Sequence, residues 1–200
     1  MAPGGTAAYR GLTDLPPLVA NAVAQAQALD FASSCRPEHG RLLQLLARGR
    51  PGGAIGETGT GCGVGLAWLT SGATARSRLI SVERDAARVA AAASVFEAHD
   101  NVTVLHSDWR SVLEHGPFDL LVLDGGGAGK DSEDRLAVED ALVVGGMVVI
   151  DDFTPANEWP PRFLGRPDEA RLRWLEDPSL QATEIRLAAD LSAIVATRVR

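Results

Sequence analysis

The sequence lacks most features that mark secreted or membrane-spanning proteins. Its two cysteines, Cys35 and Cys62, are too few for a disulfide framework, and neither belongs to a metal-spaced cluster. The N-terminus has neither the charged start nor the continuous apolar core of a secretory signal. The longest apolar run, ALVVGGMVVI, is too short to span a bilayer. We therefore expect a cytoplasmic protein without a membrane segment.

Positive charge is also scarce. The formal net charge is −7, and Lys130 is the single lysine among 19 basic residues. A protein that tracks a nucleic-acid backbone needs clustered Lys and Arg to displace counterions. The arginines near the C-terminus lie instead among proline and acidic residues, which is typical of a solvated face. The composition argues against nucleic-acid binding, while 200 residues with 46% hydrophobic content suit one domain.

The hydrophobic pattern alternates between strands and helices after two N-terminal helices. Those helices are predicted over 18–31 and 37–49, and Gly49 and Pro51 end the second one. Further strands are expected over 52–58, 78–83, 102–108, 118–124 and 146–152, with helices over 64–72, 85–99 and 133–144. This alternation predicts an α/β fold, in which helices cover both faces of a mostly parallel sheet.

The C-terminal part departs from this alternation. Only Asp190 and Leu191 separate the predicted strands 182–189 and 192–199, so an antiparallel hairpin should complete a seven-stranded sheet. Segment 153–170 is rich in proline and aromatic residues, which predicts either a lid loop or a surface insertion. We therefore expect one domain over 1–200, with N-terminal helices in 1–50, a core in 51–152, and a last helix and hairpin in 171–200.

A glycine-rich loop, ETGTGCGVG, follows the first predicted sheet strand. Gly59, Gly61 and Gly63 allow a sharp turn and a close approach of the backbone to a ligand. The dinucleotide fingerprint G-x-G-x-x-G fails, because neither register has a glycine at its sixth position. Glu57, an anion two residues before Gly59, suits a ligand that carries an ammonium and a sulfonium better than it suits a pyrophosphate.

A second glycine-rich stretch, VLDGGGAGKDSED, covers residues 122–134 and superficially resembles a phosphate-binding loop. Asp124 stands where such a loop has its first glycine, and Asp131 follows Lys130 where the loop needs Ser or Thr. The spacing therefore excludes a P-loop.

Acidic residues end the second and third sheet strands. Glu83 comes 20 residues after Gly63, where a carboxylate can accept hydrogen bonds from both hydroxyls of a ribose. Asp108, beside Trp109, could accept a hydrogen bond from an adenine amino group. Each acid alone is more often a surface residue or a helix cap. Together with Glu57, they indicate a nucleoside site.

Three more carboxylates follow the next two strands, namely those of Asp124, Asp151 and Asp152. The carboxyl ends of parallel strands share one edge of the sheet, so these groups should converge and raise each other's pKa unless a cation compensates. Oxygen ligands suit a hard ion such as Mg²⁺. Alternatively, Asp124 alone faces the site and the other two acids cap the following loop.

The motifs ETGTGCG, SVERD, LHSDW, FDLLVLD and GGMVVIDD together resemble the class I S-adenosylmethionine-dependent methyltransferases. More narrowly, they resemble the cation-dependent O-methyltransferases, the group of the catechol and caffeoyl-CoA O-methyltransferases. The resemblance covers roughly residues 33–152 and implies a Rossmann-like fold, S-adenosylmethionine as cofactor, and a small, catechol-like hydroxyl acceptor. The cofactor-binding residues that it implies are Glu57, Gly59, Thr60, Gly61, Gly63, Glu83, Arg84, Asp108, Trp109 and Asp124.

The same resemblance implies a divalent cation, such as Mg²⁺, with Asp124, Asp151 and Asp152 as its ligands. The family usually has Asp, Asp and Asn at these positions, so Asp152 adds a negative charge. Asp124 and Lys130 are the implied catalytic residues, with Lys130 as general base. Lys130 follows Asp124 by six residues, a longer gap than is usual, and the alternative is a solvated lysine at the entry of the next helix.

Other functions stay open at this point. One is a metal-independent class I methyltransferase that acts on another metabolite or on a macromolecule. Another is a non-catalytic module that binds an adenosyl ligand, whereas the glycine spacing disfavours a nicotinamide oxidoreductase. The N-terminal helices could supply a homodimer surface.

Most of the remaining reactive or aromatic side chains are expected to have structural or surface positions. Four histidines show no shared spacing and no acidic partner, which predicts structural or exposed roles for His39, His99, His106 and His115. Cys62 is expected to be a packing residue. Trp109, Phe153 and Trp159 could wall an aromatic acceptor, whereas Trp174 lies in a helical pattern and is expected in the core.

Overall fold

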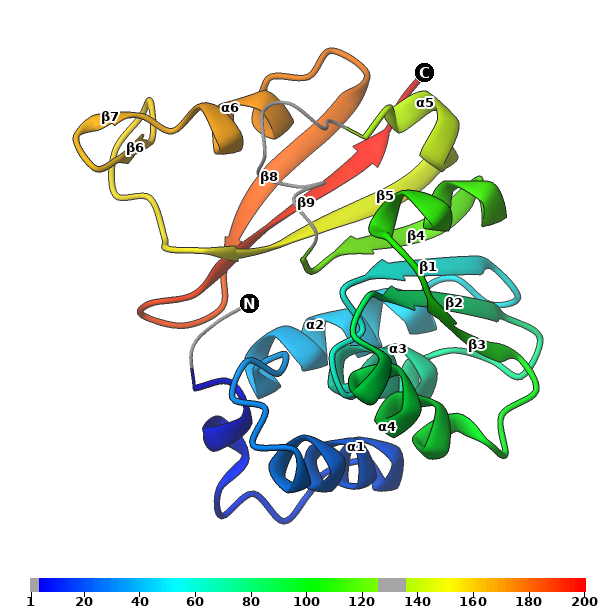
Figure 1. Cartoon of the computed structure of the whole chain (residues 1–200). Helices are drawn as coiled ribbons and strands as arrows, with labels where there is room; N and C mark the ends of the chain where they lie inside the picture. Colours follow the sequence, from blue (N-terminus) through cyan, green and yellow to red (C-terminus); the bar gives the residue numbers. More distant parts are fainter. Residues whose placement is uncertain (1–3, 126–135) are drawn as a thin grey trace.

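Seven strands form a single, mostly parallel sheet at the centre of the molecule (Figure 1). The computed structural model describes residues 4–125 and 136–200. The spatial order of the strands is β3-β2-β1-β4-β5-β9-β8, and β9 runs antiparallel to both β5 and β8. Their bounds are β1 Ala54–Thr58, β2 Arg78–Glu83, β3 Val102–His106, β4 Phe118–Leu123, β5 Leu142–Phe153, β8 Leu180–Arg186 and β9 Ser192–Arg198. The predicted α/β fold, with its seven-stranded sheet and antiparallel C-terminal hairpin, is confirmed.

Helices cover both faces of this sheet (Figure 1). One face carries α1 Pro17–Ala28, α2 Pro37–Arg48, α3 Val64–Gly72 and α4 Ala86–Phe96, with the short η1 Thr6–Tyr9 before them. The other face carries η2 Trp109–His115, α5 Val138–Ala141 and α6 Glu169–Leu175.

Strand β4 shows why its sequence is apolar from Leu120 to Leu123. Leu120 and Val122 belong to the core beneath α1–α4, whereas Leu121 and Leu123 belong to the core beneath η2, α5 and α6. A parallel strand buried on both faces reads as a continuous hydrophobic run. Among residues 4–125 and 136–200, no helix is long and apolar enough to cross a membrane.

The helix predicted over 133–144 is shorter in its described part, where it covers only Val138–Ala141. Helix α5 ends at Ala141, and β5 begins at Leu142, which pairs with Phe118 of β4. Val143 and Val144 are β-branched and fit a pleated strand better than a helix. Strand β5 is therefore twelve residues long and begins earlier than its predicted start at 146.

The C-terminal hairpin is present, but its connection is longer than predicted. Strand β8 ends at Arg186 instead of 189, because the N–H groups of Leu187 and Ala188 both donate to the carbonyl of Leu191 and close a turn. Asp190 in this turn pairs with Arg36, 3.0 Å away. The turn therefore reaches back to the segment that precedes α2.

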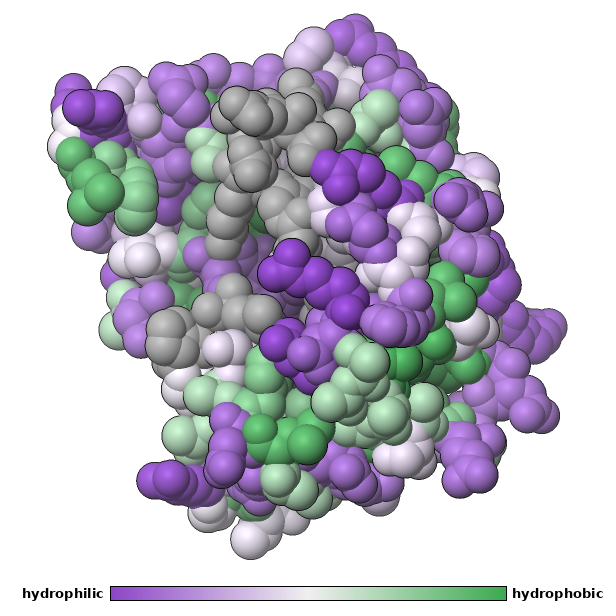
Figure 2. Space-filling view, in the orientation of Figure 1, coloured by the Kyte–Doolittle hydropathy of each residue, from purple (hydrophilic) through white to green (hydrophobic). Residues whose placement is uncertain are grey.

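The proline-rich segment after β5 folds as a small hairpin whose two ends are anchored by Arg171. This buried guanidinium donates to the Thr154 carbonyl at 2.7 Å, to Asp168 Oδ2 at 3.1 Å and to Glu184 Oε2 at 2.7 Å. The hairpin itself, β6 Arg162–Phe163 and β7 Arg166–Pro167, carries hydrophobic side chains on the surface (Figure 2). Exposed there are Trp159, Phe163 and Leu164. Whether it acts as a lid remains a prediction.

Candidate active site

The carboxyl ends of the parallel strands define the site. Strands β2 and β3 lie on one side of β1, and β4 and β5 lie on the other, so the chain reverses its direction across the sheet between β1 and β4. Open α/β sheets bind ligands in the crevice at such a switch point. The glycine loop follows β1 at this position, and Asp124 follows β4 beside it.

Glycine is required at the first position of that loop. Gly59 has a φ of +81°, and a Cβ at this residue would lie 1.7 Å from the carbonyl oxygen of Asp124. The main chains that follow β1 and β4 therefore touch, which no other residue permits. Gly63, with a φ of +90°, makes the turn into α3.

The acid before the loop, Glu57, is buried beneath the start of α3. Ser81 Oγ donates to Glu57 Oε2 at 2.5 Å, and a Cβ on Gly65 would lie 2.5 Å from Glu57 Oε1. Burial raises the pKa of Glu57 to about 8, and the carboxylates of Glu83 and Asp151 add to this rise. The site thus contains a carboxyl group that retains its proton near neutral pH.

This pKa predicts how stability responds to pH. A carboxyl whose pKa is raised on folding stays protonated in the folded state while the unfolded chain releases the proton. Stability is therefore lost as pH rises from the ordinary pKa near 4.5 to about 8. In Glu57→Gln, which cannot ionise, the free energy of unfolding should exceed that of wild type by an amount that grows with pH. We expect this difference to increase by roughly 1–5 kcal/mol between pH 5 and pH 9 in urea unfolding without cofactor. A difference that stays flat over this range would refute the assignment, and Glu97→Gln, at an exposed position, is the control substitution.

The acid after β2 lies against the glycine loop. The N–H of Gly61 donates to Glu83 Oε2 at 2.9 Å, and the N–H of Arg84 donates to Glu83 Oε1 at 3.0 Å. Glu83 is buried, whereas the Arg84 side chain is exposed. Thr60, within the loop, is buried and shares a hydrogen bond with Ser81 at 2.6 Å. The structure therefore brings Glu83 and the loop together.

The acid after β3 caps a helix. Asp108 accepts the N–H of Arg110 at 3.1 Å at the start of η2, and this bond holds the pKa of Asp108 below its usual value. Its side chain is exposed and also pairs with the Arg110 guanidinium, which lies 4.8 Å from the Trp109 ring. Adenine recognition by Asp108 and Trp109 remains a prediction. Of the other aromatic candidates, Phe153 and Trp174 are buried in the core.

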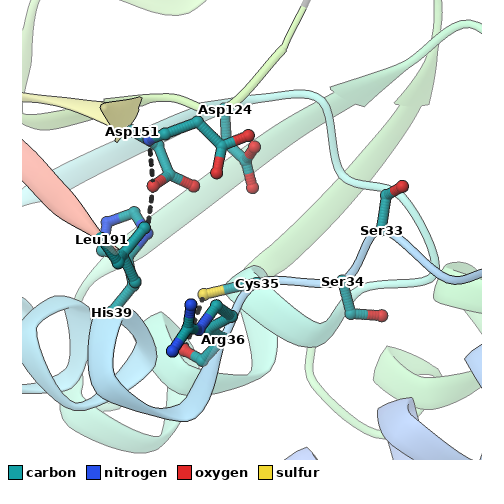
Figure 3. Close-up of a pocket in the computed structure, with 9 residues that line it drawn as sticks. Ser33, Ser34, Cys35, Arg36, His39, Asp124, Asp151 and Leu191 are labelled. Carbon is teal, nitrogen blue, oxygen red and sulfur yellow. Dashed lines mark hydrogen bonds and ion pairs between the residues drawn. The ribbon is translucent and has the colours of Figure 1, made fainter. Parts of the chain in front are cut away.

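Three carboxylates converge at the ends of β4 and β5 (Figure 3). Asp124, Asp151 and Asp152 each offer one oxygen, and these oxygens lie within 4.8 Å of one another. Asp152 has a φ of +62°, a left-handed conformation that Asp and Asn adopt more readily than most residues. The irregular end of β5, where pairing with β9 shifts register after Ile150, brings both of its acids to the site.

The electrostatics of this group favour a bound cation. Asp124 is buried, and its Oδ1 has no hydrogen-bond partner among the described residues. Burial raises the pKa of Asp124 well above its ordinary value, and the carboxylates of Asp151 and Glu57 raise it further. An unsatisfied buried oxygen within an all-oxygen donor set fits a hard divalent ion such as Mg²⁺.

The other residues that line this pocket were not predicted as site residues. They come from the segment before α2, from α2 itself and from the β8–β9 turn, and they are Ser33, Ser34, Cys35, Arg36, His39 and Leu191. His39 corrects the expectation that no histidine has an acidic partner, because its Nδ1 lies 2.8 Å from Asp151 Oδ1. No local sequence pattern joins residues so far apart in the chain. Cys62 is buried in the core, as predicted, and burial raises its pKa to about 11.

The predicted general base, Lys130, lies outside the described residues, so its role stays a prediction.

The strand order, with its antiparallel last strand, is that of the class I methyltransferase fold. The sequence agrees: residues 57–153, just under half of the chain, match the model of a family described as a methyltransferase domain. The comparison with curated proteins found no match.

Several solved structures share the fold over nearly the whole chain. TomG from Streptomyces achromogenes, an O-methyltransferase involved in tomaymycin synthesis and solved with S-adenosylmethionine, is 19% identical. Its TM-score is 0.75, over 98% of this chain and 96% of TomG. An O-methyltransferase from Bacillus cereus in complex with SAH is also 19% identical, with a TM-score of 0.71 over 97% and 96%. Cofactor-bound Rv0187 from MTB is 22% identical, with a TM-score of 0.74 over 100% and 99%.

Proposed function

We propose that this protein is an O-methyltransferase that transfers the methyl group of S-adenosylmethionine to a hydroxyl of a small, catechol-like acceptor, assisted by a divalent cation. The observation that carries the proposal is the convergence of Asp124, Asp151 and Asp152 beside the glycine loop. The likeness to TomG and to the Bacillus cereus enzyme, both O-methyltransferases by name, supports the same reaction.

The β1–β2 half of the site is suited to the methyl donor. S-adenosylmethionine supplies a methyl group on a positively charged sulfonium. Glu83 would accept hydrogen bonds from the ribose hydroxyls, as an acid at the end of β2 does in related folds. The loop Gly59–Gly63 lets the backbone approach the ligand closely, and Gly61 also fixes the Glu83 carboxylate.

The β4–β5 half is suited to the acceptor. A divalent cation held by Asp124, Asp151 and Asp152 would lower the pKa of an acceptor hydroxyl by stabilising its oxyanion. The main-chain contact between Gly59 and Asp124 places this half directly beside the donor half. The chain thus contributes mainly by holding the two reactants close together and aligned. Lys130 is proposed as the base that removes the hydroxyl proton, with a solvated surface lysine as its alternative.

Calorimetry and turnover together test the proposal. S-adenosylhomocysteine should bind with a measurable Kd, and a catechol should bind only when Mg²⁺ is also present. Methylation of the catechol should then be abolished by a chelator and restored by excess Mg²⁺. Methylation that persists in the chelator would instead favour the cation-independent alternative. If S-adenosylhomocysteine does not bind, the proposed methyltransferase activity is refuted.

A further inference from the structure

His39 lies in the first turn of α2 and is almost completely buried, with 1% of its side chain exposed. Its Nδ1 is 2.8 Å from Oδ1 of Asp151, which is also buried (Figure 3). The same Asp151 oxygen accepts the N–H of Asp152 at 2.5 Å. One carboxylate oxygen is therefore contacted from two directions, by the main chain of β5 and by a side chain of α2.

The helix that carries His39 is held tightly in place. A Cβ on Gly40 would lie 2.2 Å from the ring of Trp68, so α2 packs directly on α3. The Trp68 indole N–H donates to Tyr9 Oη at 2.9 Å, and Tyr9 Oη donates to the carbonyl of Cys35 at 2.8 Å. These contacts restrict the first turn of α2 and thus fix where the His39 imidazole can lie.

We infer that His39 is a positioning residue, which holds the Asp151 carboxylate in the orientation that binds a divalent cation. The inference rests on the proposed function and assigns His39 no contact with substrate. Groups that hold a metal-binding carboxylate in place raise metal affinity, because the ligand then needs no reordering when the ion binds. An imidazole is well suited here, since its ring is rigid and its Nδ1 makes a buried ion-pair contact with the carboxylate at 2.8 Å.

Three substitutions separate positioning from packing, with Mn²⁺ as the probe and calorimetry as the measurement. His39→Leu fills similar space but has no donor. His39→Asn places an amide nitrogen close to the position of Nδ1, whereas His39→Gln carries its amide one carbon further out. His115→Asn is the matched control. His115 precedes β4 and so lies at the amino-terminal ends of the parallel strands, away from the site at their carboxyl ends. All titrations are made on the full chain without cofactor, beside a parallel titration with S-adenosylhomocysteine.

We expect His39→Leu to weaken Mn²⁺ binding about 10- to 100-fold, and His39→Asn to retain most of the wild-type affinity. S-adenosylhomocysteine should bind all variants equally. Wild-type affinity for Mn²⁺ in both His39→Leu and His39→Asn would overturn the inference and leave the proposed function standing. If wild type itself binds no Mn²⁺, both the cation role and the inference fail. Should His39→Leu not fold, His39→Gln decides: weaker binding than in His39→Asn supports positioning, and equal binding overturns it.

Discussion

Asp124→Asn is expected to lower kcat/KM by more than about 100-fold while raising the stability of the metal-free protein. The activity loss follows because the substitution removes a charged oxygen from the proposed cation site, and even outer residues of metal sites contribute about 10- to 100-fold. The gain in stability follows because burial and the neighbouring Asp151 carboxylate raise the pKa of Asp124, so its charged form opposes folding at neutral pH. Steady-state kinetics with Mg²⁺ and urea unfolding in a chelator measure the two effects.

Asp119→Asn is the matched control, because Asp119 lies near the start of β4, the strand that Asp124 follows. Its Oδ2 accepts the N–H of Ala54 at 2.8 Å, a bond that an asparagine oxygen can also accept. This variant should keep wild-type activity and show no gain in stability. A loss of stability in Asp124→Asn, or turnover at the wild-type rate, would contradict the proposed role of Asp124 as a cation ligand. The proposed cation site would then be refuted. Opposite changes in activity and stability are the signature of a strained functional group.

The second large effect is expected at the glycine loop. Gly59→Ala should destabilise the protein by about 3–5 kcal/mol, and S-adenosylhomocysteine binding should be lost in the fraction that still folds. The added methyl group would lie 1.7 Å from the Asp124 carbonyl, and the φ of +81° is unfavourable for alanine. The strands must separate to relieve this contact, which disrupts both halves of the site. Urea unfolding and calorimetry provide the measurements.

Gly125→Ala isolates the contribution of the backbone conformation. Gly125 has a φ of +118°, but the nearest atom to an added Cβ is 3.6 Å away. This variant should therefore lower the free energy of unfolding by only about 1–2 kcal/mol, because it adds backbone strain but no steric clash. Equal destabilisation by the two variants would mean that contact between β1 and β4 does not set the cost at Gly59.

The grouping of the glycine loop with Glu83 could be predicted because its signals are local. A strand, a glycine loop and a helix follow one another over residues 54–72, and Glu83 ends the next strand. The convergence of Asp124 with Asp151 could also be predicted, since topology alone brings the carboxyl ends of adjacent parallel strands together. The α/β fold class follows from the same alternation.

The remaining features depend on tertiary packing. The approach of His39 to Asp151 requires α2 to pack on α3, and no pattern near either residue encodes that contact. The early start of β5 was missed because Leu142–Val144 fits both a buried helix and a strand, and pairing with β4 decides between them. For Asp108 the sequence left a helix cap and a ligand contact as alternatives, because both use the same residue type, and the structure shows the cap.

The anchoring of the β6–β7 hairpin by Arg171 has a consequence for evolution. Because Thr154 and Asp168 are both tied to this one guanidinium, the ends of the segment are fixed independently of the residues between them. Closing a longer or shorter loop between fixed ends changes the free energy only slowly with length. We therefore expect the hairpin to tolerate changes of sequence and length. The exposed Trp159, Phe163 and Leu164 could then be substituted while β5 keeps its two aspartates in place.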